Sequence, residues 1–226
     1  MIDTDFILEN SNVCAMWCAA GCEPTDLAHA ANTAIEQGVN TISVAPSAVA
    51  VIWPWLENKN IKILARFYLK SVNSETMSGI TANINSVFKQ GADGAQIFLN
   101  YNDMDAFVSQ IYAIRDDLFF NKRLFIGFDI TSVPPCDWNH VWDSMRRIRA
   151  DGIIFAFTND TGDNSNFVGQ VYGAMKCTGN ENKMSVHFAP MQMPGRLEQA
   201  ARLITELCPE MVDKMKFFIK DNSRAQ

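Results

Sequence analysis

The stretch that decides the fold runs from Asn40 to Arg66 and reads NTISVAPSAVAVIWPWLENKNIKILAR. Its first apolar run, 41–44, is β-branched and is soon followed by a proline, which cannot donate to a strand ladder, so we predict a buried strand there. Ala48 to Leu56 follows as a short helix that Ser47 can cap, and Ile61 to Phe67 is a second buried strand. A strand, a crossover helix and a strand predict a βαβ unit, which builds parallel sheets.

The same alternation recurs along the whole chain. Further strands are predicted at 13–20, 95–99, 124–128, 152–157, 185–189 and 215–219. Further helices are predicted at 25–37, 73–90, 104–118, 138–149, 167–176 and 197–207. Eight strand signals alternating with seven helices predict a single (β/α)8 TIM barrel over residues 1–226. A doubly wound open sheet is the alternative, which the lack of a Gly-x-Gly-x-x-Gly motif after any strand disfavours.

Composition restricts the classes of function. Hydrophobic residues make up 48% of the chain and charged residues 19%, which suits strands that are buried on both faces. The net charge of −6 and the absence of long basic runs argue against nucleic acid as a partner. No apolar run is long enough to span a membrane, and the opening MIDTDFILEN lacks the basic start of a signal peptide. We therefore expect a cytoplasmic protein with reduced thiols and without membrane contact.

A barrel places its site where the strands end at their carboxyl edge. The polar residues that fall at these predicted ends form the candidate site. They include Ser43, Arg66, Lys70, Gln96, Asn100, Asp129, Thr158, Asn159, His187 and Lys220. Because alternate residues of a strand share a face, Arg66 and Lys70 should point together, as should Gln96 and Asn100.

One family resembles this chain. The run from Ile42 to Ile63 resembles the second strand, helix and third strand of deoxyribose-phosphate aldolases. The links QGAD at 90–93 and Ala150-Asp151 resemble links of the same family, and the resemblance extends in order over most of the chain. It implies a class I retro-aldol reaction on a small sugar phosphate. In that reaction a strand-six lysine forms a Schiff base, a strand-seven lysine lowers its pKa, and a strand-four aspartate moves protons.

The sequence departs from the family pattern at the positions of the catalytic and phosphate-binding residues. The strand-six lysine position falls on Ile154, or on Phe155 in the neighbouring register. The strand-seven lysine position falls on Ala189, and the aspartate position falls on Gln96. MQMP, at 191–194, replaces the glycine pair expected for phosphate. These departures predict a divergent member whose family reaction is lost or altered.

Roles follow if some catalysis is retained. Lys70 or Lys220 would be the nucleophile, and Asp129 or His187 would carry the proton. The substrate would be bound by Ser43, Arg66, Gln96, Asn100, Thr158 and Asn159. Each role has a structural alternative: solvated loop lysines, a packed core histidine, and an ion pair of Asp129 with Arg66 or Lys70.

Three functions remain open at this point. The first is an aldolase-related enzyme acting on a small carbonyl compound or sugar phosphate. The second is a non-catalytic barrel that binds a ligand or a protein partner, including a second copy of the chain. Apolar residues at the old lysine positions and beside them favour the second, namely Ile154, Phe155, Phe157, Ala189 and Met191. The third is a metal enzyme, but Cys14, Cys18 and Cys22 lack a paired zinc spacing, so we expect core thiols, no metal and no cofactor.

Overall fold

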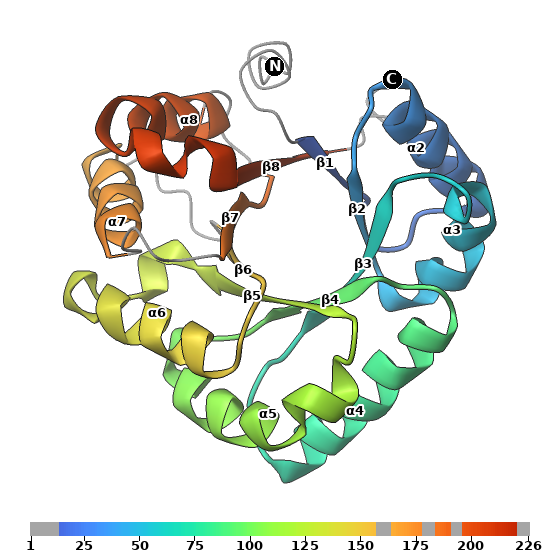
Figure 1. Ribbon diagram of the computed structural model, residues 1–226, viewed down its shortest axis with the longest axis horizontal. Helices are drawn as coiled ribbons and strands as arrows, with labels where there is room; N and C mark the ends of the chain where they lie inside the picture. Colours follow the sequence, from blue (N-terminus) through green and yellow to red (C-terminus); the bar gives the residue numbers. More distant parts are fainter. Residues whose placement is uncertain (1–13, 157–163, 178–183, 191–195, 221–226) are drawn as a thin grey trace.

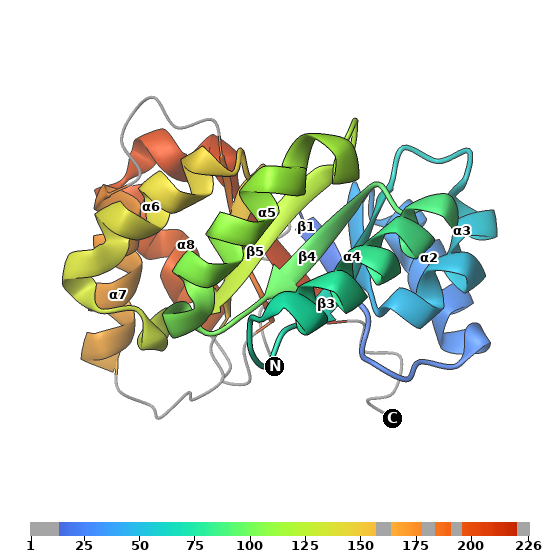
Figure 2. The same cartoon turned by 90° about the horizontal axis from the view of Figure 1, so that it is seen from below.

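The computed structural model describes residues 14–156, 164–177, 184–190 and 196–220. These residues form a closed barrel of eight parallel strands in the order β1-β2-β3-β4-β5-β6-β7-β8. Helices surround the strand ring on the outside (Figure 1). Figure 2, turned by 90°, shows the same outer helix layer from another side. The predicted (β/α)8 barrel is confirmed, and the doubly wound sheet is excluded.

Every predicted strand and helix is present. The strands are β1 Cys14–Trp17, β2 Thr41–Val44, β3 Lys62–Tyr68, β4 Gly94–Phe98, β5 Arg123–Asp129, β6 Gly152–Ala156, β7 Ser185–Phe188 and β8 Met215–Lys220. The helices are α2 Pro24–Glu36, α3 Val49–Leu56, α4 Ser74–Lys89, α5 Met104–Leu118, α6 Trp138–Arg147, α7 Asn164–Lys176 and α8 Arg196–Leu207. No helix among these residues is both long and apolar enough to cross a membrane.

Strand side chains alternate between two separate apolar clusters. One cluster joins the outer strand faces to the helices and includes Ile63, Ile97 and Phe155. The other fills the barrel interior and consists of Leu64, Phe98, Phe125, Ile154, Ala189 and Phe218. Successive side chains of a strand point to opposite faces, so only every second residue of each strand can reach a site inside the barrel.

Two Ala-Asp-Gly links set the start of β4 and of β6. The Asp93 carboxylate accepts a hydrogen bond from the Ile63 amide at 2.9 Å, and the Asp93 amide bonds back to the Ile63 carbonyl. Asp151 makes the same two contacts with Leu124, one strand pair further on. The two carboxylates therefore fix the register of β3–β4 and of β5–β6.

Tryptophans fasten the outer layer. Trp138 and Trp142 of α6 are fully buried, and their indole N–H groups donate to Gln170 Oε1 and to the Ala174 carbonyl of α7. Trp53 of α3 packs against the helix-facing cluster. Trp55 is 39% exposed, so this tryptophan only partly contributes to helix packing.

Candidate functional site

Three predicted binding residues form one hydrogen-bonded chain in the barrel interior. Arg66 Nη1 donates to Ser43 Oγ at 2.9 Å, and Ser43 Oγ donates to Gln96 Oε1 at 2.5 Å. Arg66 Nη2 donates to the Cys18 carbonyl, just after β1, at 2.6 Å. Strands β1 to β4 thus each contribute to one polar network at or near their carboxyl ends.

The Arg66 guanidinium is a buried cation. The residue is 4% exposed, and its guanidinium carbon lies 3.9 Å above the ring of Trp17. Burial lowers the pKa of Arg66, while nearby Tyr68 raises it. Among the described residues no carboxylate pairs with Arg66. A desolvated cation without a counter-charge is costly, so an anionic ligand at this position would be strongly favoured.

Aromatic rings surround this cation. Trp17 meets Phe98 edge-on at 5.8 Å and Phe218 at 5.3 Å between ring centroids. Tyr68 stacks on Phe98 at 5.1 Å and is 64% exposed. The carboxyl end of the barrel therefore combines an apolar wall with one positive charge, as is typical of small-ligand sites.

Gln96 carries an unused donor. Its side chain is fully buried, and Ser43 occupies its carbonyl oxygen, but its Nε2 has no hydrogen-bond partner in the described structure. A buried polar group without a partner costs about 1–3 kcal/mol. Such a donor is a natural contact for a ligand atom in the barrel.

Lys70 and Asn100 lie at the rim, beyond β3 and β4. Both are exposed, and Asn100 Nδ2 donates to the Lys70 carbonyl at 3.3 Å, which ties the two loops together. Asp129 ends β5, half-buried, and accepts hydrogen bonds from the Thr131 amide at 3.0 Å and the Thr131 hydroxyl at 2.7 Å. It caps the following turn, and Arg66 makes its contacts elsewhere.

His187 lies in the interior rather than at the rim. It is 1% exposed and packs between Phe125 at 4.8 Å and Phe218 at 5.5 Å. Burial lowers the pKa of His187 well below its ordinary value, and the charges of Lys216 and Arg123 lower it further. The imidazole is therefore neutral, with Nε2 2.8 Å from Ser185 Oγ.

The structure shows where the residues at the family's strand-six and strand-seven lysine positions lie. Ile154 faces the interior cluster, whereas Phe155 faces outward and packs on Trp138 and Phe188 at 5.5 and 5.4 Å. Of the two candidate positions for the strand-six lysine, only Ile154 faces the barrel interior, where it could contact a ligand. Its strand neighbour on β7 is His187, and Ala189 also joins the interior cluster.

Several predicted positions lie outside the described residues. They are Thr158, Asn159, Phe157, the run 191–194 and the side chains of Cys14 and Lys220. The backbone of Lys220 ends β8 beside Trp17 of β1. Among the described side chains, no group of three His, Cys, Asp or Glu residues could hold a metal ion.

Two aromatic residues near Arg66 were not predicted from the sequence. Trp17 and Phe98 end strands β1 and β4, but only polar residues were sought there. A search for aromatic residues on the inward parity at the strand ends would have found both.

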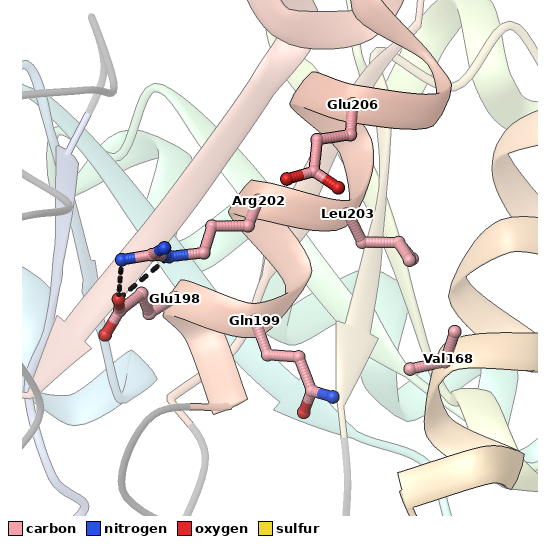
Figure 3. A pocket seen from close by; sticks show the side chains of 6 residues that line it. All are labelled: Val168, Glu198, Gln199, Arg202, Leu203 and Glu206. Atoms are coloured by element: carbon pink, nitrogen blue, oxygen red, sulfur yellow. Dashed lines mark hydrogen bonds and ion pairs between the residues drawn. The ribbon is translucent and has the colours of Figure 1, made fainter.

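A separate groove lies between α7 and α8 in the outer helix layer (Figure 3). It has a volume of about 380 Å³ and is lined by Val168, Glu198, Gln199, Arg202, Leu203 and Glu206. Arg202 is already paired with Glu198 at 2.6 Å. The groove therefore offers no uncompensated cation of the kind found at the barrel mouth.

Comparisons with known proteins agree on the architecture. No family model and no curated protein matches the sequence. The deoxyribose phosphate aldolase of Aeropyrum pernix is 13% identical, with 92% of this chain and 86% of that chain aligned and a TM-score of 0.68. A Toxoplasma gondii protein provisionally named a deoxyribose-phosphate aldolase is 14% identical over 96% and 92%, with a TM-score of 0.72.

A protein outside the aldolases is also similar. CutC of Streptococcus agalactiae, provisionally named a copper homeostasis protein, is 12% identical over 92% of this chain and 99% of that chain, with a TM-score of 0.62. At such identities a likeness establishes the fold alone. The chain is therefore a TIM barrel whose fold is that of the deoxyribose-phosphate aldolases and of at least one protein with another name.

Proposed function

We propose that this chain is a divergent aldolase-type barrel that binds a small anionic carbonyl compound or sugar phosphate without forming a Schiff base on β6 or β7. The observation that carries the proposal is the buried Arg66 guanidinium, which has no carboxylate partner in the described residues. A phosphate or carboxylate group supplies the missing charge. Trp17, Tyr68 and Phe98 would pack against the carbon skeleton of such a ligand.

The guanidinium has donors to spare. An arginine carries five N–H donors in a rigid fork. Arg66 donates one N–H from Nη1 to Ser43 and one from Nη2 to the Cys18 carbonyl. These two hydrogen bonds, together with the Trp17 ring beneath it, hold the guanidinium plane in place. A preorganised cation loses little entropy when an anion binds, which favours affinity for a small ligand.

The lack of an amine on two strands supports the non-covalent part of the proposal. Schiff-base formation needs a neutral lysine amine next to the carbonyl carbon. β6 and β7 contain no lysine, and their neighbouring interior residues are Ile154 and His187. Lys70 is exposed at the rim, away from the interior residues Ile154 and His187.

Isothermal titration with small phosphates and carboxylates tests the proposal. We expect a ligand to bind the native chain and to bind at least tenfold more weakly to Arg66→Gln, because the buried guanidinium that would pair with the anion is removed. Arg115→Lys is the matched control: Arg115 is a half-buried structural arginine that contacts the Ile148 and Arg149 carbonyls, so its loss should leave affinity unchanged. Equal affinity of native and Arg66→Gln protein would refute the proposal, provided that circular dichroism shows both to be folded.

A retained Schiff base on Lys220 is the second candidate. The backbone of Lys220 ends β8 beside Trp17, so this lysine starts at the same end of the barrel as the proposed ligand. Borohydride reduction in the presence of aldehydes separates the two mechanisms. A reduced adduct on Lys220 would establish amine chemistry at a new strand, whereas binding without an adduct supports the non-covalent site.

A further inference from the structure

Two cations lie at the opposite, amino-terminal end of the barrel strands. Arg123 is the first residue of β5 and Lys216 the second residue of β8. By the alternation along a strand, Arg123 shares a face with Phe125, and Lys216 shares a face with Phe218. Both phenylalanines belong to the interior cluster, so both cations lie on the inward side of their strands.

Neither cation has a counter-charge among the described residues. No carboxylate pairs with Arg123 or Lys216 in the described part of the chain, whereas Lys62, at the start of β3, is paired with Asp93 at 3.2 Å. Lys216 is half-buried; burial lowers its pKa, and the charge of Arg123 lowers it further. Arg123 is exposed, and its charge and that of Lys216 repel each other, a repulsion that an anion between them would relieve.

A third group near these cations also lacks a partner. His187 feels the charge of both Lys216 and Arg123, and its Nδ1 is buried without a hydrogen-bond partner in the described structure. Ser185, two residues nearer the amino-terminal end, has a half-buried hydroxyl that donates to the Asp151 carbonyl at 3.2 Å and lies 2.8 Å from His187 Nε2. The amino-terminal end thus combines two cations and one imidazole nitrogen that have no partner among the described residues.

We propose that the amino-terminal opening of the barrel binds an oxyanion, a phosphate or carboxylate group, between Arg123 and Lys216. This site is independent of Arg66, which lies at the opposite end of the strands. The oxyanion could come from either of two sources, which carry the same kind of charged group. One is a free ligand, and the other is the chain itself, because residues 1–13 join β1 at this end and carry Asp3, Asp5 and Glu9 but no lysine or arginine.

Titration with inorganic phosphate at low ionic strength tests the proposal on the full chain. If the oxyanion is a free ligand, phosphate binds native protein and binds at least tenfold more weakly to Lys216→Met. If the chain supplies it, native protein shows no phosphate binding that depends on Lys216, and the triple variant D3N/D5N/E9Q gains phosphate binding that Lys216→Met abolishes. Methionine fills the half-buried position without charge, so the variant should fold, which a thermal melt checks.

Two variants distinguish phosphate binding at this site from binding at the carboxyl-end mouth and from non-specific attraction to surface charge. Lys89→Met removes an exposed lysine at the end of α4 and should leave phosphate binding unchanged, whereas Arg66→Gln should remove the phosphate binding assigned to the mouth and leave the part that depends on Lys216. The His187 imidazole resonances should move on phosphate addition, while those of the exposed His29 and His140 stay fixed. Phosphate binding in neither native nor triple-variant protein, or binding that Lys216→Met leaves unchanged, would overturn the proposal.

Discussion

Ser43→Ala removes the centre of the buried polar chain. The Ser43 hydroxyl accepts from Arg66 Nη1 at 2.9 Å and donates to Gln96 Oε1 at 2.5 Å. Alanine leaves a buried charged donor and a buried amide oxygen without partners. At about 1–3 kcal/mol for each unsatisfied group, partly relieved by rearrangement, we expect a loss of about 2–4 kcal/mol in the free energy of unfolding.

Urea unfolding followed by circular dichroism measures this loss. Ser132→Ala is the matched control, because the Ser132 hydroxyl donates to the Asp129 carbonyl at 2.7 Å on an exposed turn. Its removal should change stability by about 0.5 kcal/mol or less. A Ser43→Ala loss as small as that of Ser132→Ala would show that the buried chain is not formed in solution.

A double-mutant cycle then tests the link between Ser43 and Gln96. Gln96→Leu removes the amide whose oxygen Ser43 satisfies and also removes the unpartnered Nε2. Because the second substitution eliminates a group that the first leaves unsatisfied, the double variant should be more stable than the sum of the single losses by about 1 kcal/mol. Strict additivity would refute the contact between these two side chains.

The other predictions concern the backbone, the interior histidine and the amino-terminal cations. Gly91→Ala should destabilise by several kcal/mol more than Gly38→Ala in urea unfolding: Gly91 has φ +107° and an added Cβ would lie 2.0 Å from Trp53, whereas Gly38 has φ +66° and open space. The pKa of His187 is depressed in the folded state from 6.5, so the unfolded chain binds more protons below about pH 6.5 and stability should fall as pH falls, by at most about 1.4 kcal/mol per pH unit. His187→Phe should flatten that part of the stability–pH profile, and an unchanged slope would contradict the depressed pKa. Lys216→Met should raise the melting temperature in phosphate-free buffer, since it ends the repulsion with Arg123; a lower melting temperature would count against that repulsion.

The order of strands and helices followed from sequence because apolar runs and helix stops are local signals. β4 was expected at 95–99 and observed at Gly94–Phe98, a shift of one residue. The predicted strand 13–20 is longer than β1, Cys14–Trp17, because the apolar run continues into the turn after it. Apolar composition alone does not distinguish a buried strand from a buried turn.

The candidate site was predicted residue by residue, but its contacts were not. Ser43, Arg66 and Gln96 were each placed at strand ends, while their hydrogen bonds depend on the relative stagger of β2, β3 and β4. The stagger also places His187 in the interior, since its neighbours are Ile154 in the middle of β6 and Lys216 near the start of β8. Lys216 itself was overlooked because the search covered only the carboxyl ends of the strands.

Intact-mass spectrometry after borohydride reduction tests the central claim most directly. The full chain is incubated with deoxyribose 5-phosphate or with acetaldehyde, reduced, and compared with protein reduced alone. With no lysine on β6 or β7 and Lys70 exposed to solvent, the account predicts no added mass beyond that of a surface-lysine control protein. A stoichiometric adduct on one lysine of this chain would contradict it and would show that the barrel retains a lysine able to form a Schiff base.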